Sequence, residues 1–278
     1  MFIADAQVHI WVDNSPERPW SGKAHKPVAL TAERLLGEMA TAGVSRAVLV
    51  PPSWDDNRND LVAKASEDRP ERFKAMGRLD LDQPGAVDRV ARWKELPGML
   101  GIRSSFNRMP WIPQLTDGRA DRLWDEAEKA DVPIALMVTH QQIPLIDRAA
   151  ERHPGLRLAI CHCAFPTGKK GEEAFRDFDM LLPIAKRPNV MVKVSALPSY
   201  APDQYPYRSM HPFVRRVYDA FGPKRMFWGT DLSTLPCTYR QSITMFTEEM
   251  PFLSSDDLDW IMGRGLGEWL RWEMPKAG

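Results

Sequence analysis

The sequence has few cysteines, no excess charge and no long apolar run. Its 278 residues include three cysteines, an odd number that argues against a disulfide framework and favours a cytoplasmic, reducing compartment. Lys plus Arg and Asp plus Glu both total 37. With no net field to attract nucleic acid or an anionic membrane, neither is an expected partner. No apolar run approaches the roughly 20 residues that span a bilayer.

The absence of a leader segment, a glycine-rich turn, linkers and repeats reduces the number of possible folds. The N-terminal MFIADAQVHIW has no basic leader, and Asp5 interrupts its apolar stretch, so we expect no signal peptide. No glycine-rich turn follows this segment, which argues against a nucleotide-binding doubly wound sheet. No linker or repeat divides the chain, and 44% hydrophobic with 27% charged residues is ordinary for a globular protein. We therefore expect a single domain over residues 1–278.

Short apolar segments alternate with amphipathic ones along the chain. Helical spacing is clear for Leu123, Ala127 and Ala130, which fall on one face. The apolar segments predict eight strands at 2–10, 44–51, 73–79, 99–103, 133–139, 156–162, 190–196 and 225–230. Strands that alternate with helices favour parallel pairing. Eight such units predict an α/β fold, a (β/α)8 TIM barrel.

A barrel of this type carries its chemistry where the strands end. In the first segment Asp5, Gln7 and His9 alternate with apolar residues, so we expect all three to face the interior. Later segments end in side chains that can bind an anion, carry a proton or ligate a metal: Arg103, His140, His162, Lys193 and Asp231. We therefore expect an active site at this end.

Three stretches carry a resemblance to a known family. DAQVHIW at 5–11 resembles the D-x-H-x-H-x-W opening of the amidohydrolase-related family, amidohydrolase 2 type, in its lactonase-like TIM-barrel branch. LIDRAAERHPGLRLAICHCAFP at 145–166 and RMFWGTDLS at 225–233 resemble its sixth-strand and eighth-strand motifs, and the likeness runs over nearly the whole chain. The resemblance implies these catalytic residues: His9, Arg103, His162 and, as general base, Asp231.

Gln7 departs from the family pattern, which has histidine there. An amide is a poorer zinc ligand than imidazole. Because the family includes lactonases that work without metal, the resemblance favours no cofactor. The alternative is a divalent metal, Zn or Mn, bound by His9, His140, His162 and Asp231.

Two long polar loops are predicted to cover the site. Residues 13–30 include Trp20, and residues 198–212 hold Tyr200, Tyr205 and Tyr207. Loops of this length are often functional, although a stiff surface crossing explains them equally well. Candidate substrate-binding residues are these four, Gln7 and His140. His25, His153 and His211 are expected in loops or at the surface.

The resemblance implies hydrolysis of a small lactone or related cyclic ester. Asp231 would activate water, His9 and His162 would polarise the carbonyl, and Arg103 would bind a carboxylate or stabilise the oxyanion. Two alternatives stay open: a metal-dependent decarboxylase of an aromatic or unsaturated acid, and a non-catalytic binding barrel. The expected partner is a small-molecule substrate. A homo-oligomer also stays open, since barrel rims often associate.

Overall fold

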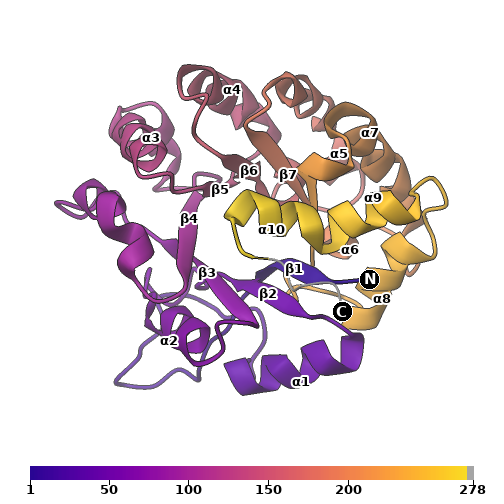
Figure 1. Cartoon of the computed structure of the whole chain (residues 1–278), viewed down its shortest axis with the longest axis horizontal. Coiled ribbons are helices and arrows are strands. Elements are labelled where there is room, and N and C mark those ends of the chain that lie inside the picture. Colours follow the sequence, from indigo (N-terminus) through magenta and orange to yellow (C-terminus); the bar gives the residue numbers. More distant parts are fainter. Residues whose placement is uncertain (274–278) are drawn as a thin grey trace.

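Eight parallel strands form the centre of the computed structural model, which describes residues 1–273 (Figure 1). Each strand pairs with the next in chain order. The strands are β1 (Ala4–Val8), β2 (Arg46–Leu49), β3 (Phe73–Arg78), β4 (Met99–Ser105), β5 (Ile134–Met137), β6 (Leu158–Ile160), β7 (Val190–Ser195) and β8 (Met226–Gly229). The prediction of an eight-stranded (β/α)8 barrel is confirmed. Residues 274–278 of the predicted domain lie outside the described residues.

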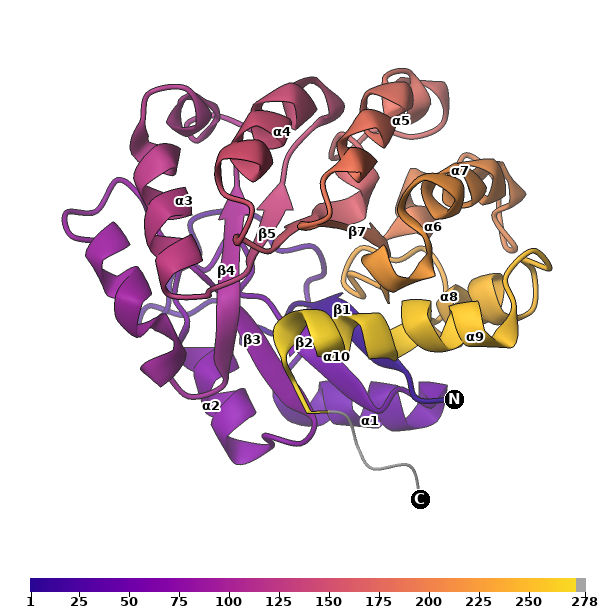
Figure 2. The same ribbon diagram turned by 45° about the horizontal axis from the view of Figure 1, so that its top comes forward.

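The connecting helices lie around the outside of the strands (Figure 2). They are α1 (Ala32–Ala42), α2 (Asp60–Asp68), α3 (Arg119–Lys129), α4 (Ile143–Arg152), α5 (Glu172–Phe175), α6 (Leu197–Tyr200), α7 (His211–Phe221), α8 (Tyr239–Thr247), α9 (Ser255–Asp259) and α10 (Gly265–Leu270). A 3-10 helix, Val87–Glu95, connects β3 to β4. Within residues 1–273, no helix has the length and apolar character needed to cross a membrane.

The barrel interior is filled by small and apolar side chains, among them Ala6, Val50 and Phe227. Helix α10 packs Leu266 and Trp269 onto the same cluster. The residue before β6, Arg157, donates a hydrogen bond to the Trp269 carbonyl. Helix α10 therefore closes the end of the barrel where the strands begin, and leaves the opposite end for chemistry.

Strand β1 does not alternate regularly, so the expectation that Asp5 faces the interior is wrong. Its pairing with β2 shifts register between Asp5 and Val8. As a result, Ala4 and Ala6 join the interior cluster, while Asp5 contacts Thr230 and Tyr239 of α8. Gln7 and His9 still reach the pocket at the end of the barrel.

Asp5 joins the two edge strands of the sheet. Its carboxylate accepts hydrogen bonds from the backbone N–H of Gln7 (3.0 Å) and of Thr230 (2.9 Å). The hydroxyl groups of Thr230 (2.5 Å) and Tyr239 (2.7 Å) donate to its other oxygen. Beside it, the N–H of Asp231 donates to the Gln7 carbonyl at 2.9 Å. These bonds bring β1 and β8 together and so place Gln7 beside Asp231.

Candidate active site

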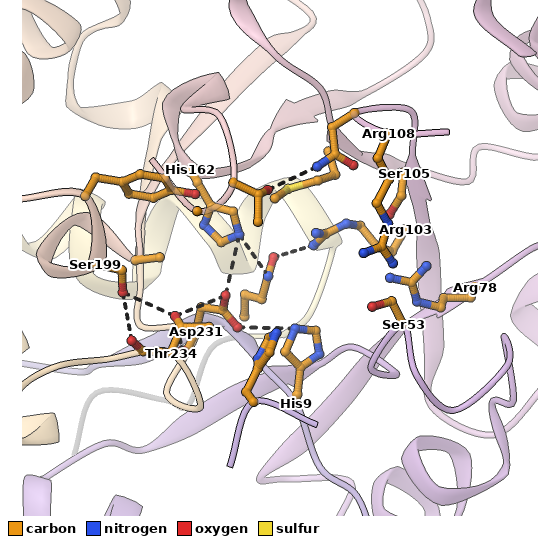
Figure 3. A pocket seen from close by; sticks show the side chains of 18 residues that line it. His9, Ser53, Arg78, Arg103, Ser105, Arg108, His162, Ser199, Asp231 and Thr234 are labelled. Carbon is orange, nitrogen blue, oxygen red and sulfur yellow. Dashed lines mark hydrogen bonds and ion pairs between the residues drawn. The ribbon is translucent and has the colours of Figure 1, made fainter. Parts of the chain in front are cut away.

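A cavity of about 350 Å³ lies at the carboxyl ends of the strands (Figure 3). Four of the residues predicted to be catalytic line it: His9, Arg103, His162 and Asp231. Gln7 and Tyr200, predicted to bind substrate, line it as well. The strand-end rule for barrels therefore located the pocket correctly.

The last three strands all turn into the cavity through the same backbone conformation. His162 follows β6, Ala196 follows β7 and Asp231 follows β8, with φ of 51°, 56° and 50°. This left-handed region is unfavourable for residues other than glycine, at of order 1–3 kcal/mol each. All three residues line the pocket, so the strain lies where the functional side chains are aimed.

A chain of hydrogen bonds fixes the protonation state of His162. Arg103 Nη1 donates to Gln7 Oε1 at 2.6 Å, so the other end of the amide is its NH2 group. Gln7 Nε2 lies 3.1 Å from His162 Nε2, which must accept with its lone pair. His162 Nδ1 therefore carries the hydrogen and donates to Ser195 Oγ at 2.8 Å. Burial lowers the pKa of His162 to about 3. Asp231 opposes this shift, while the positive charges of Arg103 and Lys193 add to it, so the ring is neutral.

His9 pairs with Asp231. Its Nδ1 lies 2.7 Å from the Val50 carbonyl oxygen, which only accepts, so Nδ1 carries a hydrogen. Its Nε2 lies 3.2 Å from Asp231 Oδ1. Burial alone would raise the pKa of Asp231, but the charge and hydrogen bond of His9 outweigh it and hold that pKa well below its usual range. Asp231 is thus an ionised carboxylate inside the cavity.

One wall of the cavity is cationic. Arg78, Arg103 and Arg108, which we call the arginine face, all line it. Arg78 Nε donates to the Pro51 carbonyl at 2.9 Å, and the buried Nε of Arg103 has no hydrogen-bond partner within residues 1–273. Burial and the charges of Arg103 and Arg108 lower the pKa of Arg78 to about 9. The face remains positive at neutral pH and is suited to an anion or an oxyanion.

Several predicted site residues lie elsewhere. His140 turns away from the pocket: its Nε2 contacts the Cys163 carbonyl oxygen at 3.0 Å, and its ring packs against Phe165 and Phe178. Burial lowers its pKa. Trp20, Tyr205 and Tyr207 are not among the residues that line the cavity. Tyr205 instead bonds Thr244 of α8 at 2.9 Å.

The predicted metal ligands are not assembled into a metal site. In the part of the chain that the structure describes, no group of three or more His, Cys, Asp or Glu side chains is arranged to hold a metal ion. His140 is turned away, and Gln7 occupies the lone pair of His162. Only His9 and Asp231 of the four remain, and they bond each other. This arrangement does not fit a metal.

Among the arginine and histidine side chains that line the pocket, the sequence analysis did not assign three to the site: Arg78, Arg108 and His25. Arg78 is the last residue of β3, and Arg103 lies near the end of β4. The rule that places functional residues at strand ends could therefore have found Arg78 as well. Arg108 and His25 come from loops, and no local pattern marks them. His25 is an exposed loop residue, as predicted, but it also lines the cavity, with its ring centroid 4.5 Å from that of Trp54.

Comparison with known proteins shows the family of the chain. The sequence model of the amidohydrolase family, Amidohydro_2, matches residues 4–264. The chain belongs to this family. Over 238 residues the chain is 28% identical to an L-fucono-1,5-lactonase from Burkholderia ambifaria, covering 83% of this chain and 80% of the lactonase. Membership supports an amidohydrolase-superfamily hydrolase.

Solved structures share the barrel. An amidohydrolase from Burkholderia multivorans with bound zinc superposes with a TM-score of 0.81 at 20% identity, over 98% of this chain and 99% of its own. A 5-carboxyvanillate decarboxylase from Sphingomonas paucimobilis gives 0.66 at 13% identity, over 97% and 99%. At these identities the likeness concerns the fold alone.

Proposed function

We propose that this amidohydrolase hydrolyses a small lactone, with Asp231 as the group that activates water. One observation carries the proposal: an ionised carboxylate faces a cavity whose other wall is the arginine face. The first group can take a proton from water, and the second can stabilise the negative charge that forms on a carbonyl oxygen. The similarity to an L-fucono-1,5-lactonase supports the same substrate class.

The proposed reaction uses only side chains of this chain. As the water oxygen bonds to the lactone carbonyl carbon, Asp231 accepts a proton from it. The carbonyl oxygen becomes negative against the arginine face, and His9 holds the Asp231 carboxylate in place through the 3.2 Å contact. When the bond from carbon to ring oxygen breaks, Asp231 returns the proton to that oxygen. The carbonyl re-forms as a carboxylic acid, which releases the second water proton to solvent. The product carboxylate then stays on the arginine face, which also accommodates a carboxylated lactone.

We also propose that the reaction needs no bound metal. Gln7 donates to the one nitrogen of His162 that could ligate a metal, and Arg103 holds Gln7 in that orientation. A metal at His162 would have to displace the amide and leave the buried Arg103 without its partner. Losing such a hydrogen bond to a charged group costs on the order of 1.5–3 kcal/mol.

The test combines a substrate panel with metal analysis. Purified protein is assayed with L-fucono-1,5-lactone, other aldonolactones and carboxylated lactones, before and after chelation, and its metal content is measured. Ring opening that persists with substoichiometric metal and is lost in Asp231→Asn supports both proposals. Activity lost with a stoichiometric metal refutes the metal-free reaction. Carbon dioxide release from an aromatic acid, with no lactone opened, favours the decarboxylase alternative instead. Turnover of neither class favours the binding barrel.

A further inference from the structure

Residues 13–30, the first predicted covering loop, form a strap that is anchored at one side of the cavity. Arg18 binds both Asp55 and Asp60, with Nε at 2.9 Å from Asp55 Oδ1 and Nη1 at 2.6 Å from Asp60 Oδ2. Asp55 is almost completely buried and takes two hydrogen bonds from Arg18, so this pair is enclosed and bidentate, whereas Asp60 is exposed. Nearby, the N–H of Ser21 donates to the Trp54 carbonyl at 2.9 Å. The strap is thus fixed to the loop after β2.

The far end of the strap is held by the loop after β8. His25 Nδ1 lies 2.8 Å from Ser233 Oγ, and Lys26 Nζ donates to the Leu232 carbonyl at 3.4 Å. The His25 ring packs edge-on against Trp54, and its centroid lies 5.9 Å from that of His9. The strap therefore runs from β2 to β8 and presents His25 to the cavity beside the pair formed by His9 and Asp231.

His25 has the properties of a neutral hydrogen-bonding group. Burial and the neighbouring His9 lower its pKa, so the ring is uncharged at neutral pH. Ser233, itself buried, engages Nδ1. No hydrogen bond to Nε2 is formed within residues 1–273, while Trp54 fixes the plane of the ring. A neutral imidazole beside Asp231, away from the arginine face, is suited to a hydroxyl group, which can both donate and accept.

We propose that His25 binds a hydroxyl group of the substrate, so that the strap selects hydroxylated lactones over unsubstituted ones. This inference rests on the proposed lactonase function and specifies which lactones the cavity takes. The arginine face receives the carbonyl oxygen, and His25 receives a hydroxyl on the part of the ring that lies nearer the strap. A lactone without that hydroxyl leaves His25 to water, because the residue is exposed, so the site favours the hydroxylated ring by the net value of one hydrogen bond, roughly 3-fold to 10-fold in affinity.

The experiment measures binding separately from turnover. Dissociation constants for L-fucono-1,5-lactone and for δ-valerolactone, the same ring without hydroxyl groups, are measured calorimetrically in the Asp231→Asn background. His25→Phe keeps an aromatic ring against Trp54 but removes the hydrogen bond. We expect it to weaken the binding of L-fucono-1,5-lactone about 3-fold to 10-fold and to leave the binding of δ-valerolactone unchanged. His25→Asn, which retains a hydrogen-bonding group, should recover part of the affinity. His211→Phe, outside the cavity, is the matched control.

The outcomes separate this inference from the proposed function. The role of His25 is overturned if His25→Phe weakens the binding of both lactones equally or changes neither. It is also overturned if the protein binds neither lactone. Binding that depends on His25 in a protein that opens no lactone overturns the proposed function but keeps the hydroxyl site. If Asp231→Asn does not fold, the same comparison is made with the wild-type protein and the ring-opened acids, L-fuconate and 5-hydroxyvalerate. Arg18→Leu, which releases the strap, should reproduce the loss seen in His25→Phe.

Discussion

Gln7→Glu should convert His162 from a neutral ring into a titrating one. In the wild-type protein, Gln7 Nε2 donates to His162 Nε2 at 3.1 Å, and the pKa of His162 is about 3. The variant places a carboxylate oxygen against the same nitrogen. Two unit charges at that distance attract by about 5 kcal/mol at an effective dielectric constant of 20. Even half of that value, left after Arg103 neutralises part of the carboxylate, raises the pKa of His162 by about two.

The assay is a pH titration of the imidazole nitrogen resonances in protein labelled at histidine. We expect wild-type His162 to stay neutral, with its hydrogen on Nδ1, down to about pH 4. In Gln7→Glu it should titrate between about pH 5 and 7. Gln204→Glu, an exposed site, makes the same charge change and should leave His162 unaltered. A wild-type His162 that titrates near pH 6.5, or a resonance that Gln7→Glu does not move, would refute the assigned hydrogen-bond chain.

Further predictions concern the base, the strand junction and the strained backbone. Asp231→Asn should lower kcat by on the order of 10²–10⁴ with little change in Tm; near wild-type turnover would remove Asp231 from the role of base. Burial raises the pKa of Asp5 from 3.8 to about 6 against its four hydrogen bonds, so native protein keeps this proton to higher pH than unfolded chain. Its stabilising contribution is complete below pH 4 and falls by about 3 kcal/mol as the pH rises through 6. Between pH 4 and 7, the free energy of unfolding in urea should rise by that amount in Asp5→Asn relative to the wild-type protein. Parallel plots of this free energy against pH for the two proteins would contradict the prediction. Ala196→Gly relieves a left-handed residue and should not lower the free energy of unfolding, whereas Ala196→Val should lower it by more than about 1 kcal/mol.

The barrel could be predicted from the sequence because the pattern of a strand followed by a helix is repeated along the chain. Each strand segment is short, apolar and followed by a helical pattern, so eight weak indications agree on one topology. Residues at strand ends then follow from the topology itself, as Arg103, His162 and Asp231 show. Motif resemblance identified the same residues, since those motifs are the strand ends.

What could not be predicted depends on side-chain direction. His140 follows β5 at the expected position, but a 3-10 turn, His140–Gln142, sends its ring toward Cys163 and two phenylalanines. Regular alternation along β1 predicts that Asp5 faces the interior with Gln7 and His9. A register shift between Asp5 and Val8 breaks this alternation, so Asp5 does not face the interior. His25 reaches the pocket only because contacts to Trp54 and Ser233, distant in sequence, hold the strap across it. Long-range contacts of this kind leave no local pattern.

The junction that Asp5 makes between β1 and β8 links the order of folding to the appearance of activity. Asp5 and Thr230 lie 225 residues apart, so their contact closes one of the longest loops that the chain can form. Gln7 and Asp231 meet only when this loop closes. An intermediate that contains β1 to β6 can be compact and helical, yet it has no carboxylate opposite the arginine face. During refolding, recovered turnover should therefore lag behind recovered helical circular dichroism, which makes catalysis itself a probe of the final closure.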